Sequence, residues 1–104
     1  MTATEKLAKR IIRTPGICGG QPRIEGHRIR VRDVVMWFEA LRMSADEIAN
    51  EYDLSLSDIY LALAYYHANQ QELQKEWDAN DAYVEQMMEK SPSRLKAYQK
   101  GGKA

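Results

Sequence analysis

The spacing of apolar residues along the chain changes near residue 32, from alternation to a helical repeat. Before that point, RIIR at residues 10–13 predicts a short strand, and PRIEGHRIRV at residues 22–31 alternates apolar residues with arginines. A turn at Glu25 and Gly26 would join the two short arms of this second segment. The pattern therefore predicts a short N-terminal β ribbon whose arginines face solvent.

The helical repeat predicts a first helix from about Arg32 to Leu41, with Val34, Phe38 and Leu41 on one stripe. In SADE, which follows, Ser44 and Glu47 can form a capping box at the start of a short second helix.

SLSD repeats the capping pattern of SADE, because Ser55 and Asp58 can cap a third helix from Leu56 to about Ala68. A short helix, a tight turn and a longer helix form the arrangement of a helix-turn-helix. The fold class predicted is mainly α, with a short N-terminal β ribbon, a helix-turn-helix-like three-helix core and a long C-terminal amphipathic helix.

That last helix is predicted from a seam of residues spaced three and four apart, which ends near Pro92: Leu73, Trp77, Asn80, Val84 and Met87. We expect residues 1–69 to form the ribbon and helix-turn-helix-like domain, and residues 70–104 to form the amphipathic helix and a basic tail. The seam suits either self-association or binding of another protein, and the sequence leaves both open.

Composition is that of an ordinary small domain: 104 residues, of which 44% are hydrophobic and 29% are charged. The apolar runs are too short to cross a bilayer, and MTATEKLAKR lacks the apolar core of a signal peptide. A cytoplasmic protein without membrane contact is expected. Cys18 is the only cysteine, so no intramolecular disulfide can form.

Charge is segregated although the formal net charge is zero. Residues 1–42 hold nine Lys or Arg against four acids, and residues 43–68 hold five acids with no Lys or Arg. Residues 69–90 hold six acids against two lysines, and the residues from 91 onward carry only basic charges. The layout predicts contact with polyanions at the two ends of the chain.

The glycine-rich stretch TPGICGGQ does not predict a nucleotide site, because it lacks GK[ST] and leads into another extended segment. Cys18 and His27 have no orienting third group, and with His67 they show no metal-ligand spacing. We expect no enzyme activity, catalytic residue, cofactor, metal or small-molecule substrate. An enzyme that uses the glycine turn is the most distant alternative.

The predicted third helix is a poor reader of DNA bases, because its first turn, Leu56 to Tyr60, offers no Arg, Lys, Asn or Gln. It is apolar on nearly every face, so we expect it to lie between its own core and a second copy, or under the long helix. The predicted homodimer interface consists of Tyr60, Leu61, Ala64 and Tyr65.

The ribbon is the better candidate for DNA, since its arginines recur at a spacing near two and could meet successive phosphates or guanine edges. The predicted DNA-binding residues are Arg23, His27, Arg28, Arg30 and Arg32. In the alternative, these arginines are solvated or pair with the acidic middle of the same chain.

IIRTPGICGGQPRIEGHRIRVRDVV, the segment from Ser44 to Tyr52 and LSLSDIYLALAYYHAN resemble the small bacterial domain-of-unknown-function family 433 over about Arg10 to Asn69. The residues in register with the family pattern are the glycines, Cys18, Pro22, Gly26, Arg28, Ile29 and Val31. A Gly often stands before the capping box in the family, where this chain has Arg42 and Met43.

The resemblance implies an antitoxin of a toxin-antitoxin pair, with a PIN-like ribonuclease as the toxin. The expected function is that of an antitoxin-like regulator that binds this toxin, and operator DNA, as a homodimer. The long helix and tail lie outside the region of resemblance and inherit nothing from it. Their own chemistry suits toxin binding, with Arg94 and Lys96 neutralising an acidic metal-binding pocket. The toxin-binding residues are then Leu73, Trp77, Val84, Met87, Arg94 and Lys96. The alternative is a dimeric protein-interaction module without nucleic-acid binding.

Overall fold

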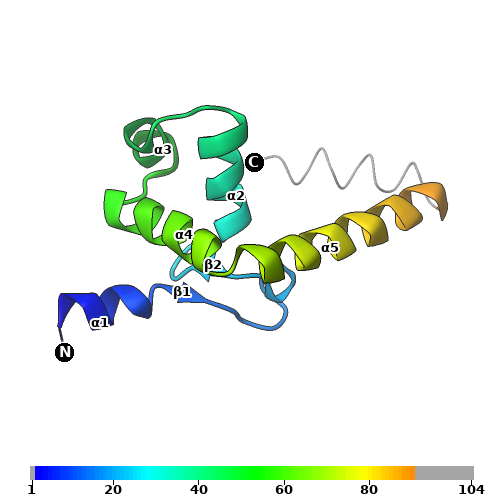
Figure 1. Ribbon diagram of the computed structural model, residues 1–104, viewed down its shortest axis with the longest axis horizontal. Coiled ribbons are helices and arrows are strands. Elements are labelled where there is room, and N and C mark those ends of the chain that lie inside the picture. The colour runs from blue at the N-terminus through cyan, green and yellow to red at the C-terminus, as the bar shows by residue number, and fades with distance from the viewer. Residues whose placement is uncertain (1, 91–104) are drawn as a thin grey trace. The chain divides into compact units, whose positions relative to one another are not determined.

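The computed structural model describes residues 2–90 (Figure 1). The chain divides into two units, residues 1–69 and 70–104. The elements of the first unit are α1 (Ala3–Ala8), β1 (Ile11–Ile12), the 3₁₀ turn η1 (Cys18–Gly20), β2 (Arg23–Ile24), α2 (Val31–Val35), the π-helical turn η2 (Met36–Ala40), α3 (Ala45–Tyr52) and α4 (Leu56–Ala68). The second unit contains α5 (Gln70–Lys90). The predicted fold class, mainly helical with a short β ribbon, is confirmed.

One helix, α1, was not predicted from the sequence. The Thr2 hydroxyl caps it by accepting a hydrogen bond from the Glu5 amide at 3.2 Å. Thr followed three residues later by Glu is a sequence signature of a helix start, so the signal was present.

The predicted strand at residues 10–13 is present as β1. Of the two predicted arms of residues 22–31, the first contains β2 and the second is irregular. β1 and β2 pair antiparallel, with Ile11 opposite Ile24. The second arm folds back on β2 through a hydrogen bond from the Ile24 amide to the Ile29 carbonyl at 2.9 Å and a single bridge between Arg23 and Arg30. Gly26 turns the chain between the arms with a φ of 82°, a conformation that favours glycine.

The helix predicted at about Arg32 to Leu41 is present as α2 followed by η2, but its predicted apolar stripe is wrong. The Leu41 amide donates to the carbonyl five residues earlier, at Met36, over 3.0 Å. This wider turn breaks the α-helical spacing on which the predicted stripe depends. Val34 is buried, whereas Phe38 and Leu41 are 36% and 62% exposed.

Trp37, and not Phe38 or Leu41, packs inward from this turn. Its ring stacks on that of Tyr52 in α3, with the ring centroids 3.7 Å apart and the planes within 6°. The Met43 amide donates to the Trp37 carbonyl at 3.0 Å, and the chain leaves the turn through Arg42, whose φ is 58°. A non-glycine residue in this left-handed region carries a conformational cost of roughly 1–2 kcal/mol.

Replacing Arg42 with Gly is therefore expected to raise the free energy of unfolding by about 0.5 kcal/mol. Glycine removes the left-handed cost at position 42, and the greater freedom of glycine in the unfolded chain offsets about 0.4–1 kcal/mol of that gain. Urea denaturation of the two proteins measures the difference. Arg42→Ala is the control, because it removes the charge and keeps the cost, so a gain from Ala equal to that from Gly would refute the explanation.

Both predicted caps form, one fully and one in part. In α3 the Glu47 amide donates to the Ser44 hydroxyl, and the Ser44 amide donates to the Glu47 carboxylate, each at 3.1 Å. At α4 the Asp58 amide donates to the Ser55 hydroxyl at 3.1 Å. The Asp58 carboxylate binds Arg10 rather than completing the box.

The core of the first unit forms around α4, which contacts α1, β1, α2 and α3. One face of α4 is buried, through Ile59, Ala62, Leu63 and Tyr66. The opposite side is open: Tyr60 is 57% exposed, Leu56 and Ala64 are exposed, and Leu61 and Tyr65 are half-buried. The core of one chain therefore buries only one face of α4, whereas the sequence predicts a helix covered on nearly every face.

The long amphipathic helix is confirmed as α5, a helix of 21 residues. Of its predicted seam, Leu73 and Trp77 are buried, and Asn80, Val84 and Met87 are exposed. Arg94 and Lys96 lie outside the described residues. Within residues 2–90, no helix is both long and apolar enough to span a bilayer.

Candidate functional site

The five residues predicted to bind DNA do not form one solvated row. Arg28 is exposed, and its side chain makes no hydrogen bond or ion pair with any other described residue. Only its backbone is engaged, because the Arg28 carbonyl accepts a hydrogen bond from Cys18 Sγ at 3.2 Å. Arg28 is thus free to meet an anion.

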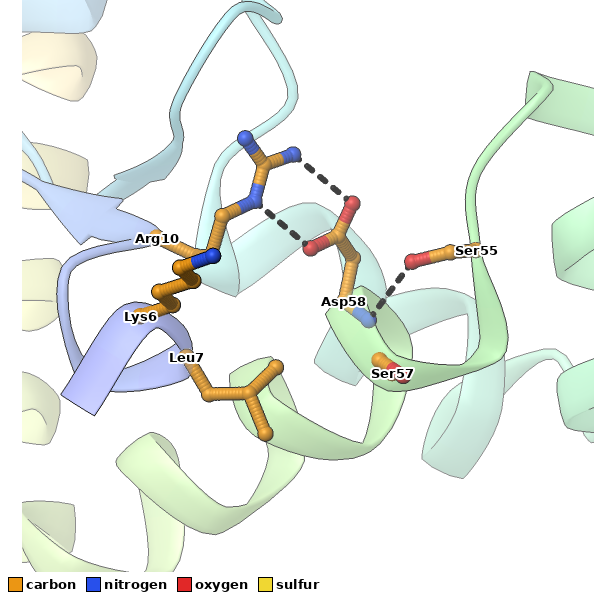
Figure 2. A pocket seen from close by; sticks show the side chains of 6 residues that line it. All are labelled: Lys6, Leu7, Arg10, Ser55, Ser57 and Asp58. Carbon is orange, nitrogen blue, oxygen red and sulfur yellow. Dashed lines mark hydrogen bonds and ion pairs between the residues drawn. The ribbon is translucent and has the colours of Figure 1, made fainter. Parts of the chain in front are cut away.

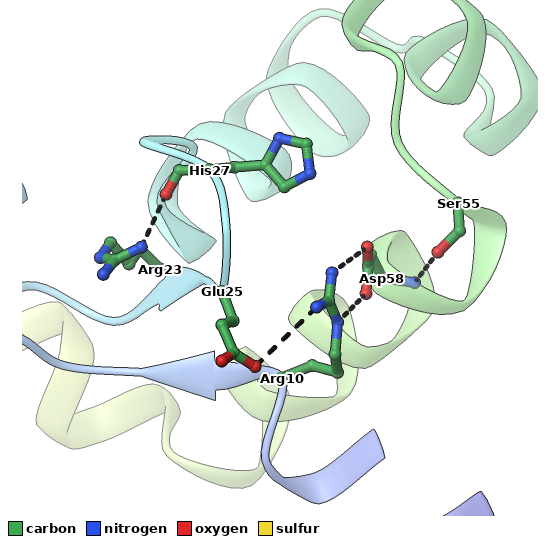
Figure 3. A network of polar contacts seen from close by, with 6 residues as sticks. All are labelled: Arg10, Arg23, Glu25, His27, Ser55 and Asp58. Atoms are coloured by element: carbon green, nitrogen blue, oxygen red, sulfur yellow. Dashed lines mark hydrogen bonds and ion pairs between the residues drawn. The ribbon is translucent and has the colours of Figure 1, made fainter. Parts of the chain in front are cut away.

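Arg23 faces inward, contrary to the prediction. One guanidinium nitrogen donates to the His27 carbonyl at 2.9 Å and the other to the Thr14 hydroxyl at 3.2 Å (Figure 3). The side chain is half-buried, and its Nε is buried without a hydrogen-bond partner among the described residues. Because one bond spans the turn from β2 to His27 and the other joins β2 to Thr14, Arg23 holds the ribbon together and is poorly placed to bind DNA.

Arg30 is committed to a carboxylate of its own chain. It donates to Asp33 through Nη2 at 2.7 Å and Nε at 3.1 Å, and its amide donates to the same carboxylate at 2.9 Å. Arg30 thus pairs within its own chain, but with Asp33 and not with the acidic residues 43–68 that the alternative named. Arg32 is half-buried and likewise has a partner within the chain.

A two-pronged ion pair joins Arg10 and Asp58, two residues that the sequence analysis did not connect. Arg10, just before β1, donates to Asp58 in the first turn of α4 through Nε at 3.1 Å and Nη2 at 3.0 Å (Figure 3). Arg10 Nη1 also lies 3.9 Å from the Glu25 carboxylate. The side chain of Asp58 is only 7% exposed and that of Arg10 is 34% exposed.

This pair controls the ionisation of Asp58. The hydrogen bonds from Arg10 hold the pKa of the Asp58 carboxyl below its ordinary value, although burial acts in the opposite direction. The charge of Arg10, the Ser55 hydrogen bond and the nearby His27 lower the pKa further. The same contact raises the pKa of Arg10. His27, predicted to face DNA, is half-buried with its imidazole on the side of the Asp58 pair in Figure 3.

An open groove of about 490 Å³ lies beside this pair, between α1 and the start of α4 (Figure 2). It is lined by Lys6, Leu7, Arg10, Ser55, Ser57 and Asp58. Because Arg10 and Asp58 neutralise each other, Lys6 is the uncompensated charge of the lining. We assign no ligand to this groove.

The glycine-rich turn is built by backbone conformation. Gly16, Gly19 and Gly20 have positive φ values between 64° and 83°, and Cys18 shares the left-handed region at 52°. Cys18 is held by its bond to the Arg28 carbonyl, whereas the His27 carbonyl accepts a hydrogen bond from Arg23, so the two residues serve different contacts. Among residues 2–90, no three His, Cys, Asp or Glu side chains gather closely enough to hold a metal ion.

The residues predicted for the dimer interface share one side of α4, where Tyr60 and Ala64 are exposed and Leu61 and Tyr65 are half-buried. In α5 the exposed large apolar residues are Tyr83, Val84 and Met87. Tyr83 was not among the predicted toxin-binding residues, although its position four residues before Met87 places it on the same side of the helix.

Comparison with known proteins places the first unit among related domains. The family model described as "Protein of unknown function (DUF433)" matches residues 11–66. The crystal structure of a DUF433 member protein from Anabaena variabilis ATCC 29413 is 32% identical in sequence, covers 70% of this chain and 72% of that one, and has a TM-score of 0.60. No curated protein matches the chain.

Proposed function

The chain belongs to the DUF433 family, and we propose that it acts as an antitoxin-like regulatory protein that binds a PIN-like ribonuclease toxin through α5. The observation that supports this role is the exposed apolar side of α5, formed by Tyr83, Val84 and Met87. An amphipathic helix with anchors three and four residues apart is suited to an apolar groove on another protein. The proposed role involves no catalysis by this chain.

The experiment is co-expression with the ribonuclease encoded next to this gene, followed by titration of the purified proteins. We expect a complex that inhibits the ribonuclease. A Val84→Asp/Met87→Asp variant should weaken binding roughly 100-fold, because two apolar anchors would be replaced by carboxylates. Ala82→Asp is the matched control, since Ala82 is exposed and lies on the other side of α5. Equal affinity of the two variants, or a gene with no such neighbour, would refute the proposal.

A homodimer formed through the open side of α4 is part of the same proposal. Tyr60, Ala64, Leu61 and Tyr65 supply a continuous apolar strip along the helix. In a two-fold symmetric dimer, the same strip of a second copy would cover this strip. If the dimer forms and no DNA is bound, the protein is the alternative, a dimeric protein-interaction module.

Operator DNA is a second candidate ligand, which the exposed and unpaired side chain of Arg28 favours. A dimer would present Arg28 twice. Arg28→Ala should weaken binding to DNA from upstream of the gene and reduce the slope of log affinity against log salt by about 2, one for each lost phosphate contact. Arg30→Ala is the control, because that guanidinium is occupied by Asp33 and its loss should leave the slope unchanged. A DNA affinity that does not change with salt concentration would exclude the ribbon as the DNA contact.

A further inference from the structure

We propose that α5, in the toxin-binding role proposed for it, occupies the basic surface along which the ribonuclease holds its RNA, so that this protein and RNA compete. The proposal rests on the proposed function and adds which surface of the enzyme is covered. Its basis is the charge beside the exposed apolar side of α5, which Tyr83, Val84 and Met87 form. Apolar contacts alone suit many grooves, whereas charged residues at their border restrict the kind of groove.

One border of the apolar side is acidic. Asp81 lies three positions before Val84 and belongs to an exposed row with spacings of three and four: Asp78, Asp81, Glu85 and Glu89. Asp78 accepts a hydrogen bond from the uncharged side chain of Gln74 at 3.1 Å. Glu85 and Glu89 form no hydrogen bond or ion pair with any other described residue. These two carboxylates are therefore available to cations of a partner.

The opposite border of the apolar side is uncharged. Three exposed residues form it at the same spacing, namely Ala79, Ala82 and Gln86. A groove that covers the apolar side of α5 thus meets carboxylates along one edge only. The complementary groove has an apolar floor and Lys or Arg along one wall.

A ribonuclease needs a groove of this kind for its own substrate. RNA is a polyanion whose phosphates are bound mainly by Lys and Arg. Proteins that hold single strands combine such a basic groove with aromatic and apolar side chains on which the nucleobases stack. RNA and α5 would therefore use the same cations and the same apolar floor, and binding of one would exclude the other.

A second copy of α5 does not complement this helix in the same way. Residues 76–89 contain five Asp or Glu and no Lys or Arg, so a second α5 offers no cation to the acidic border. Two acidic borders brought together would repel. The charge thus favours a basic groove on a different protein as the occupant.

The test measures RNA cleavage by the ribonuclease encoded next to this gene, with the full chain added at several RNA concentrations. Competition predicts an apparent inhibition constant about tenfold higher when RNA is at about ten times its KM than at low RNA. An inhibition constant that does not change with RNA would overturn the proposal and leave the toxin-binding role intact. Absence of any complex would refute both. Self-association of this chain that Val84→Asp/Met87→Asp abolishes would assign the apolar side to a second copy.

Two variants with the same change in net charge test the acidic border. Glu85→Gln/Glu89→Gln removes two negative charges from this border, and Ala82→Lys/Gln86→Lys adds two positive charges to the uncharged one. The first should weaken the complex about tenfold and reduce its dependence on salt, because it removes ion pairs with the basic wall. The second should change the affinity less than about threefold. Equal affinities of the two variants would overturn the proposal, whatever the result for the apolar residues.

Discussion

Replacing Asp58 with Asn is expected to lower the free energy of unfolding by about 2 kcal/mol near neutral pH. The carboxylate accepts two hydrogen bonds from the Arg10 guanidinium, and hydrogen bonds to charged groups contribute roughly 1.5–3 kcal/mol. Removing one partner of a fully buried pair costs more, about 3–5 kcal/mol. Arg10 is one-third exposed and can recover part of its hydration, so the smaller value applies.

The stability that Asp58→Asn loses should become smaller as the pH falls. The hydrogen bonds from Arg10 hold the folded-state pKa of Asp58 below the value in the unfolded chain, which is about 3.9. The carboxylate therefore stabilises the protein above about pH 4, and this contribution disappears as the pH falls through the folded-state pKa. The difference between the wild type and Asp58→Asn should narrow toward pH 2.

Urea denaturation at pH 7 and at several acidic pH values measures both effects. Glu25→Gln is the control, because Glu25 lies 3.9 Å from Arg10 with its side chain 55% exposed, and an exposed pair of this kind contributes little. The explanation is wrong if Asp58→Asn is as stable as the wild type at pH 7, or if the difference between them stays constant down to pH 2.

The elements that could be predicted from the sequence are those with local signals. The Ser44 and Ser55 caps and the long α5 repeat each depend on residues within a few positions of one another, and each is present in the structure. The π turn could not be predicted in this way, because the apolar spacing from Val34 to Leu41 suits an ordinary α-helix. Arg42 adopts a φ of 58°, in the region that favours glycine, and an arginine at this position gives no local signal of the turn.

The candidate site was harder to predict because its contacts join distant segments. Arg10 and Asp58 are 48 residues apart, and nothing in their local sequence connects them. The alternation of arginines indicated a ribbon, of which Arg23–Ile24 forms a strand and the second arm is irregular. Alternation does not determine which guanidinium meets a carbonyl or carboxylate of its own chain. Arg23 and Arg30 do so, and of the five predicted residues Arg28 alone is exposed.

Replacing Ile59 with Ala is expected to lower the free energy of unfolding by about 3 kcal/mol, the largest effect of a single substitution considered for this protein. Ile59 is fully buried on α4, the helix that contacts α1, β1, α2 and α3. Removing its side-chain carbons would lose their burial and leave a cavity that the surrounding helices fill only in part. Thermal and urea denaturation at one protein concentration measure this loss.

Tyr60→Ala distinguishes the two sides of the same helix. Tyr60 is 57% exposed in a single chain, so its loss from a monomer should cost less than about 1 kcal/mol. If the open side of α4 is the dimer interface, Tyr60→Ala should instead weaken the dimer, and its melting temperature should fall below that of the wild type at protein concentrations where only the wild type is dimeric. Sedimentation across a dilution series separates these cases. A monomeric protein in which Tyr60→Ala costs as much as Ile59→Ala would contradict the assignment of buried and open faces, because only a side chain packed within its own chain can produce a large loss that is independent of concentration.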